Sequence, residues 1–443
     1  MSAPRTHADL AADGPPPSPF AGLAAGMERG IARGLARITG GAIGQYQVAI
    51  VRIGFALTEL LFLLREIPHR SALYGPDSAW GFDLATQLVA GNHAFTVLLW
   101  SDSRAWFELV YVGAIAACVM LLLGWRTRTA SVLFMIAVLS LQNRSVFMGD
   151  GGDNVIHLMA IYLVFTRCGQ VWSLDRWLAD RAERTRKAAT SSPDGAEPPA
   201  AVARPLGAGL DPAGIALWTV LGAALLAASL AGKLSTGWAL AFWGGWLLQG
   251  IWWTVRRYAP GEPRTVMDIF ADIIHNGAML VIVVEVCLIY STAGWYKIQG
   301  SRWQDGTALY YPLHLDDFTP WPALSHALAG NELMVMLITY GTVMVQVAFP
   351  FTLFNRRVKN VLLVAMILEH ASIAVVLGLP FFSLAMIAAD VVFLPTGFLV
   401  WAGDRLTRLV RPRRETPAPV IHGQREAPSE ESAVGRPPPS AVT

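Results

Sequence analysis

A single lysine, Lys297, ends a long apolar stretch and has Trp295, Tyr296 and Trp303 as neighbours in the sequence. A lysine among aromatic residues at the end of a membrane span is commonly an anchor whose ammonium reaches water. The alternative is a catalytic base, because a partly desolvated amine holds its proton less tightly and can accept one from a substrate. Both interpretations place the amine where a helix meets the membrane surface.

A second group of polar residues surrounds the turn 143–154, where Asp150, Asp153 and His157 follow one another at helical spacings. Side chains at such spacings share one side of a helix, so these three are candidates for a substrate or metal site. Asp153 is also a natural N-cap for the helix that follows, and Arg144 would pair with either carboxylate. Helix capping and a functional site both stay open here.

Other ionisable residues stand inside apolar stretches, where they are costly and therefore mark structural or functional contacts. Arg52 and Glu59 are two helical turns apart, share a face and could pair through a neighbour. Glu285, Glu369-His370 and Asp390 each interrupt a run that is otherwise apolar. We interpret Arg52, Glu59, Glu285 and Asp390 as structural polar residues, although a functional carboxylate fits Glu285 equally well. His370 joins the candidate site residues.

The amino-acid composition of the chain is typical of a membrane protein. Of 443 residues, 54% are hydrophobic and only 15% are charged, whereas a soluble domain has about 25% charged residues; the mean hydropathy is +0.44. An ordinary soluble enzyme is therefore excluded. The net charge of +2 is small and the arginines cluster beside apolar segments, so we expect no nucleic-acid partner. The three cysteines lack metal-type spacing, and we expect neither a disulfide framework nor a metal.

We predict an all-α, polytopic integral membrane helical bundle of about 8–10 transmembrane helices. A span needs about 20 apolar residues, and eight stretches approach this length: 46–65, 106–124, 129–147, 154–167, 270–296, 332–353, 358–378 and 381–401. The region 214–255 is apolar twice over and breaks near Lys233–Gly237, which is typical of a turn between two helices. Ten spans result if this region crosses twice, and eight if it lies in the interface.

Arginine clusters set the expected orientation, because positive charge stays on the cytoplasmic side. They precede the first span, join the second to the third, follow the fourth, and recur before 262, near 356 and after 404. Both termini of this multi-pass cell-membrane protein should therefore be cytoplasmic, with the loops 67–104, 143–154 and 297–331 outside. The predicted parts are a cytoplasmic segment with an amphipathic surface helix (1–45), two membrane halves (46–184 and 214–401), a disordered linker (185–213) and a disordered tail (402–443).

Several short motifs, taken together and in this order, resemble the HTTM (horizontally transferred transmembrane) domain family, which includes the vitamin K-dependent gamma-glutamyl carboxylases. The resemblance covers about 45–176 and 285–396. The matching residues are Val51–Gly54, Leu123–Arg128, Ser140–Arg144, Gly151–Asn154, Trp172–Asp175, Ala293–Lys297, Trp303, Gly306, His370 and Phe382–Leu384.

The resemblance implies an enzyme that oxidises a reduced naphthoquinone (vitamin K or menaquinone) with O2 to the epoxide, and uses the base so generated to carboxylate a substrate carbon with CO2. It assigns the catalytic base to Lys297, with Arg144, Asp153, Asn154, His157, Trp303 and His370 supporting a substrate or quinone site, and no metal. The carboxylases have two adjacent lysines where this chain has Tyr296-Lys297, and only a short tail follows Trp401 in place of their large luminal domain. Quinone chemistry is therefore better supported than carboxylation of protein glutamates, and the substrate, protein or small molecule, stays unassigned.

Two other classes of protein fit the same composition. In a non-catalytic scaffold or immunity-type protein, the polar residues would only hold helices together. A transporter would be expected to show an internal repeat, and none is clear. Lipid and quinone are the partners we expect for the enzyme.

The arginine pattern makes a topological prediction. Cysteines introduced at Ser191 and Ser429 should react with an impermeant thiol reagent only from the cytoplasmic side, and one at Ser301 only from outside. Labelling of Ser301 from the cytoplasm would contradict the orientation and the placement of Lys297 near the outer surface.

Overall fold

The computed structural model describes residues 19–190 and 211–410, and this part of the chain is helical without any strand. The remaining segments, which hold most of the predicted linker and tail, lie outside the described residues. Two borders differ from the predicted parts: α8 (Leu174–Thr190) runs into the predicted linker, and α17 (Thr396–Val410) into the predicted tail. From Val400 onward the chain belongs to a second compact unit, which within the described residues is helical.

The first half begins with the amphipathic α1 (Pro19–Thr39). Its core is a group of four helices: α2 (Gln45–Arg65), α5 (Arg104–Leu123), α6 (Thr127–Arg144) and α7 (Gly151–Val164). Two short helices, α3 (Arg70–Tyr74) and α4 (Phe82–Asn92), lie in the long connection between α2 and α5. A helical hairpin follows α8, made of α9 (Pro212–Leu230) and α10 (Thr236–Tyr258).

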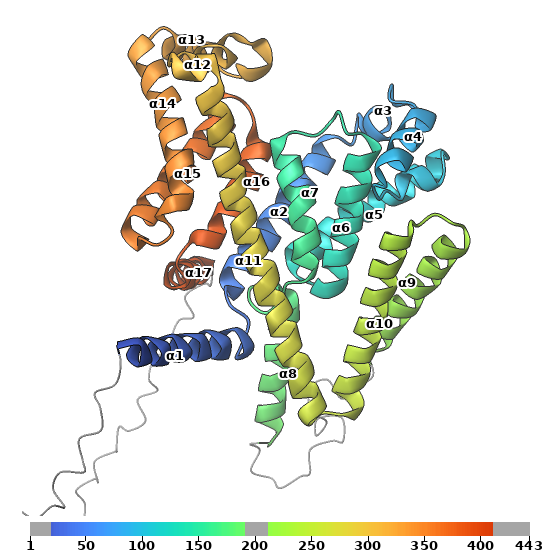
Figure 1. Cartoon of the computed structure of the whole chain (residues 1–443). Coiled ribbons are helices and arrows are strands. Elements are labelled where there is room, and N and C mark those ends of the chain that lie inside the picture. The colour runs from blue at the N-terminus through green and yellow to red at the C-terminus, as the bar shows by residue number, and fades with distance from the viewer. Residues whose placement is uncertain (1–18, 191–210, 411–443) are drawn as a thin grey trace, which may run out of the picture. The chain divides into compact units, whose positions relative to one another are not determined.

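The second half is organised around α11 (Glu262–Gln299), a helix of 38 residues. Figure 1 shows it beside both halves, with α1 and α8 near its start and the short α12 (Ser301–Gln304) and α13 (Pro322–Ala329) near its end. We call these the α8 end and the α13 end. The chain continues through α14 (Glu332–Ala348), α15 (Arg356–Val376) and α16 (Pro380–Asp390); α16 packs against α15, α2 and α7.

Six helices among the described residues are long and apolar enough to cross a membrane, which is consistent with a multi-pass membrane protein. They are α2, α5, α9, α11, α15 and α14 with its 3-10 extension to Thr352, and a seventh results if the bent segments 380–393 and 396–409 form one span. The run predicted at 381–401 is thus not one helix, because Pro395 lacks the N–H that a continuous helix requires. The runs predicted at 129–147 and 154–167 correspond to α6, of 18 residues, and α7, of 14 residues. As a membrane span, α6 is too polar at its ends and α7 is too short.

The helical hairpin predicted within 214–255 is present and is tied to the first half at both ends. Near its start, Arg126 donates to both oxygens of Asp211 at 2.8 and 2.9 Å, and this hydrogen-bonded pair lowers the pKa of the Asp211 carboxyl. At its turn, Lys233 Nζ donates to the carbonyl of Trp100 at 3.1 Å. Between these points, the stacked rings of Trp218 and Trp246 join the two helices of the hairpin.

A buried arginine fixes the α8 end of the first half. The Arg52 side chain is fully buried, and its guanidinium donates to the carbonyls of Leu121 (2.6 Å), Leu122 (3.2 Å) and Trp172 (2.7 Å). Two of these carbonyls belong to the last turn of α5, where a helix lacks internal donors and carries partial negative charge. Our expectation that Arg52 could pair with Glu59 through a neighbour is wrong: within the described residues no ion pair joins them, and both terminal nitrogens of the guanidinium donate to carbonyls instead.

The contacts around Arg52 explain why the motif residues at positions 124 and 175 are a glycine and an aspartate. Gly124 has φ +68°, and a Cβ there would lie 2.5 Å from the Arg52 guanidinium. Asp175 accepts hydrogen bonds from the backbone of Arg126 and Thr127, both at 2.8 Å, and thereby caps α6. Two motif regions that are distant in sequence therefore meet at Arg52. We call this contact region the Arg52 joint, and its role is structural.

Replacing Arg52 tests this joint. Arg52→Met keeps much of the volume but leaves one buried and two partly buried carbonyls without their charged donor, so the free energy of unfolding should fall by about 3 kcal/mol. Thermal unfolding of the purified protein in detergent should show a clear drop in Tm, whereas Arg37→Met, at an exposed position of α1, should not. Equal Tm values for the two variants would contradict the structural role.

Candidate functional site

Lys297 ends a chain of polar side chains that crosses three helices. Its Nζ, on α11, donates to Oε1 of Gln346 on α14 at 2.8 Å, and Nε2 of Gln346 donates to Oε1 of Glu369 on α15 at 2.6 Å. Gln346 is buried, while Lys297 and Glu369 are half-buried. The lysine also lies over the ring of Trp303, with Nζ 5.2 Å from the ring centroid. The neutral amide thus sits between a cationic and an anionic group.

Small and aromatic residues of α11 bring α14 into place. Gly294 lies against α14 so closely that a Cβ would be 2.5 Å from Cγ2 of Val347. One turn earlier, the ring of Tyr290 meets Phe349 edge to face, with centroids 6.1 Å apart. The glycine of the Ala293-Gly294 motif therefore lets Gln346 reach Lys297.

A second polar chain lies deeper between α11, α15 and α16. The Tyr290 hydroxyl donates to the Asp390 carboxylate at 2.9 and 3.1 Å and lies 3.0 Å from Nε2 of His370. All three side chains are at most 2% exposed. His370 is the chain neighbour of Glu369, and Lys297 is close enough for its charge to act on the His370 ring. The two chains therefore form one polar region.

The structure thus brings together Lys297, Trp303 and His370 of the predicted site residues, and adds Asp390, which we interpreted as structural. The sequence did not single out Gln346 or Tyr290. Gln346 was detectable, since it is an amide inside the apolar run 332–353. Tyr290 carried no such signal, because a tyrosine in an apolar helix is ordinary.

The remaining polar residues inside helices stay outside this region. Glu59 is buried in α2. Glu285 is half-buried on α11, where its Oε2 is enclosed without a hydrogen-bond partner among the described residues. Neither makes a contact with the Lys297 network that would assign it a role in the site.

The turn 143–154 forms a capping box. Asp150 is the N-cap of α7 and accepts from Gly152 N (2.6 Å) and Asp153 N (3.0 Å), while Asp153 accepts from Asp150 N at 2.9 Å. Our assignment of the N-cap to Asp153 is therefore wrong by three residues, because the helix starts at Gly151. Asn154 donates back to the Asp150 carbonyl at 3.2 Å.

Arg144 pairs with neither carboxylate, contrary to our expectation. It is 2% exposed and donates to the carbonyls of Trp80 (2.9 Å) and Gly75 (3.3 Å). Asn143 likewise donates to the carbonyl of Phe95 at 2.9 Å. These motif residues hold the connection between α2 and α5 at the α13 end. His157, on α7, is half-buried, and within the described residues no cluster of His, Cys, Asp and Glu could hold a metal.

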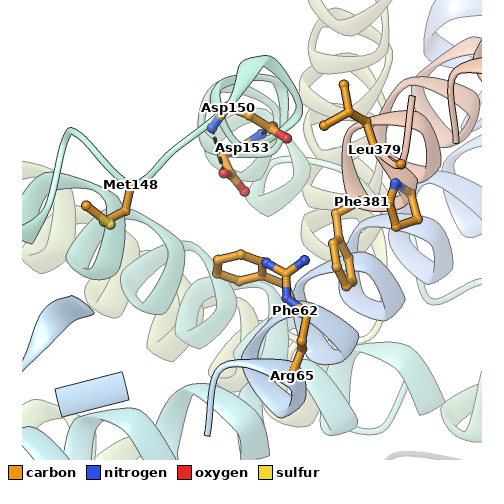
Figure 2. Close-up of a pocket in the computed structure, with 9 residues that line it drawn as sticks. Phe62, Arg65, Met148, Asp150, Asp153, Leu379 and Phe381 are labelled. Atoms are coloured by element: carbon orange, nitrogen blue, oxygen red, sulfur yellow. Dashed lines mark hydrogen bonds between the residues drawn. The ribbon is translucent and has the colours of Figure 1, made fainter. Parts of the chain in front are cut away.

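Two cavities lie near the starts of α7 and α5. One, of about 160 Å³, is lined by the capping box, by Met148, by residues 378–381 and by Phe62 and Arg65 (Figure 2). The Arg65 guanidinium stacks over the ring of Phe381 at 4.4 Å from its centroid. The other, of about 220 Å³, is lined by Arg144 and by the segment before α5. Lys297 lines neither of these two cavities.

Comparison with known proteins gives no match to a family model, to a curated protein or to a solved structure.

The capping box generates a test of the role of the turn. Asp150→Ala removes both acceptor bonds and should lower the free energy of unfolding by about 1 kcal/mol. Asp153→Asn keeps an oxygen that can accept from Asp150 N, so Tm should stay near the wild-type value. If Asp153→Asn also keeps full activity in the quinol assay described below, Asp153 serves capping alone; a loss of activity at unchanged Tm would place it in a site.

Proposed function

We propose that this chain is a membrane-embedded enzyme that oxidises a reduced naphthoquinone with O2 to the epoxide, in the manner of the vitamin K-dependent carboxylases, with Lys297 as the base. The observation that carries the proposal is the placement of the Lys297 amine. It lies at the end of an apolar helix and its hydrogen-bond acceptor is the neutral amide of Gln346. A lysine that serves only as an interfacial anchor commonly reaches water with its ammonium, whereas this amine is directed to a buried side-chain amide within the bundle.

The half-buried amine suits a substrate that arrives through the bilayer. Trp295 and Tyr296, beside Lys297 on α11, are 62% and 75% exposed, so the apolar surface next to the amine is open to lipid. A quinol head group, O2 and CO2 all partition into lipid, and the Trp303 ring offers an aromatic face next to Nζ. In this reaction the quinol would be oxidised and O2 reduced, with one oxygen atom of O2 entering the epoxide and the other leaving as water.

The chain's own residues would do three things in this reaction. Lys297 would accept the proton of the quinol hydroxyl, Gln346 would hold the amine in place through its oxygen, and Glu369 would fix the orientation of the Gln346 amide. The carboxylate accepts only from the amide nitrogen, so the amide oxygen must face Lys297. We further propose that the protein is inserted with both termini in the cytoplasm and that it carboxylates a substrate carbon.

A second candidate function is a non-catalytic membrane scaffold or immunity-type protein. The joints around Arg52 and Arg144 favour it, because there the motif residues bind backbone carbonyls. The two functions separate in one assay: purified protein in lipid nanodiscs, supplied with reduced menaquinone and O2, is examined for quinone epoxide by mass spectrometry. The enzyme forms the epoxide and the scaffold does not.

Substitution of Lys297 tests the base. Since a general base contributes roughly 10²–10⁴-fold to a rate, Lys297→Ala should lower epoxidation by at least about 100-fold at unchanged Tm. Lys297→Arg should not restore the rate, because a guanidinium keeps its proton, whereas an added small amine should restore part of it in the Ala variant.

The matched control is Lys233→Ala, since Lys233 also follows an apolar helix and donates to a carbonyl. This control should epoxidise at the wild-type rate. A Lys297→Ala protein as active as wild type would exclude lysine catalysis.

A further inference from the structure

The hydrogen bonds around Tyr290 determine which proton each partner holds. A carboxylate can only accept, so the Tyr290 hydroxyl hydrogen points to Asp390. The Tyr290 oxygen must then accept from Nε2 of His370, 3.0 Å away. His370 therefore carries its proton on Nε2, and its Nδ1 has a free lone pair.

The free lone pair belongs to one of nine buried side-chain atoms without a hydrogen-bond partner among the described residues, and it is the histidine nitrogen among them. His370 is 2% exposed, and Nδ1 is enclosed without a hydrogen-bond partner among the described residues. Buried polar atoms normally have partners, and an exception requires an explanation. A histidine that only packed helices together would be expected to use both ring nitrogens.

We propose that Asp390, Tyr290 and His370 form a proton relay whose receiving end is Nδ1 of His370. A proton that binds Nδ1 forms a new N–H bond, and the Nε2 proton passes to the Tyr290 oxygen. The original Tyr290 proton passes to Asp390, whose carboxylate becomes a carboxylic acid. Nδ1 and the Asp390 carboxylate each gain one proton, Nε2 loses one, and the Tyr290 oxygen exchanges one for another, so the step adds one proton in total and transfers no electrons. The His370–Tyr290 hydrogen bond and one of the two Tyr290–Asp390 hydrogen bonds reverse direction.

The source of this proton is the quinol, and this part of the proposal rests on the proposed function. Lys297 must release the proton taken from the quinol before it can act again. Lys297 is joined through Gln346 to Glu369, the chain neighbour of His370 on α15, so the lysine network and the receiving nitrogen belong to the same part of that helix. Asp390 would then hold the proton deep in the bundle, beside α2, where Gly54 lies against Ala388.

The protonation state of His370 separates a relay from a static network. The charged and titratable groups near the His370 ring are Tyr290 and Lys297 on α11, Asp390 on α16 and Glu369 on α15. The Phe382 ring packs edge-on against the His370 ring, with ring centroids 5.4 Å apart. Solid-state 15N NMR of histidine-labelled full-length protein in lipid would be measured between pH 8 and 4. The His370 signal is assigned by its loss in His370→Gln.

A relay predicts that one added proton gives a neutral ring protonated at Nδ1 and bare at Nε2. In Tyr290→Phe, whose ring packing is kept, the same step should give an imidazolium protonated at both nitrogens. If Tyr290→Phe does not fold, Asp390→Asn serves in its place. An imidazolium in the wild type, or no change in protonation down to pH 4, would overturn the relay.

Kinetics separate the relay from the proposed function. His370→Gln keeps an amide donor for Tyr290 but has no acceptor at the Nδ1 position, so kcat for epoxidation should fall at least about 10-fold while KM for the quinol is unchanged. Glu285→Gln, another carboxyl change on α11, should leave kcat unchanged. Wild-type kcat in His370→Gln would overturn the relay alone. Absence of epoxidation in the wild type would remove the proposed function, and the nitrogen signals would still decide on the relay.

Discussion

A polar group taken out of water must find its partner within the chain, and this constraint organises the whole bundle. Transfer of an unpaired amide or hydroxyl into an apolar environment costs several kcal/mol, and a charge costs more. The chain meets this cost without buried ion pairs at its two arginine joints. Arg52 and Arg144 both donate to backbone carbonyls that their helices and loops leave unpaired. Each arginine therefore fixes segments that are distant in sequence, and these segments frame the site.

The same constraint acts differently around Lys297. Here lysine, glutamine and glutamate are arranged in line, with the amide between the charges, and the lysine and glutamate are half-buried. The deeper Asp390–Tyr290–His370 chain is fully buried and leaves one nitrogen without a partner. At the two arginines the donors meet backbone carbonyls, whereas this region links side chains that can exchange protons, namely an amine, a carboxylate and an imidazole. This contrast is the physical reason for placing chemistry here and not in the turn 143–154.

The sequence predicted the parts of the fold that depend on local pattern. The apolar runs gave α2, α5 and α15 to within two residues of their ends, because twenty apolar residues have few alternatives to a helix. The run 270–296 gave α11 without its first eight residues, and the break near Lys233 gave the hairpin. The break at Pro395 was predictable from the missing N–H and was overlooked. The capping box was displaced because several residues of the turn can cap a helix, and only the backbone shows which one does.

Partners in space were the part that the sequence could not supply. The spacing of Arg52 and Glu59 suggested an ion pair, but nothing in the sequence reveals that the end of α5 and Trp172 come to lie beside Arg52. Lys297 and His370 were singled out separately, by an aromatic context and by an apolar one. Their common region depends on the close approach of α14 at Gly294 and of α16 at Gly54, and neither helix contact has a signature in a single sequence.

The account depends most directly on the contact between α11 and α14 that brings Gln346 to Lys297. Cysteine cross-linking in native membranes measures it: in a protein without its three natural cysteines, Gly294→Cys and Val347→Cys are combined and exposed to a mild oxidant. A Cβ at Gly294 would lie within 3.5 Å of the Val347 Cα, so a disulfide should form rapidly and in high yield. The pair Gly277→Cys and Val347→Cys, with Gly277 several turns earlier on α11, should form none. If the Gly294 pair does not cross-link, or cross-links no faster than the Gly277 pair, α14 does not lie where the Lys297 network requires it.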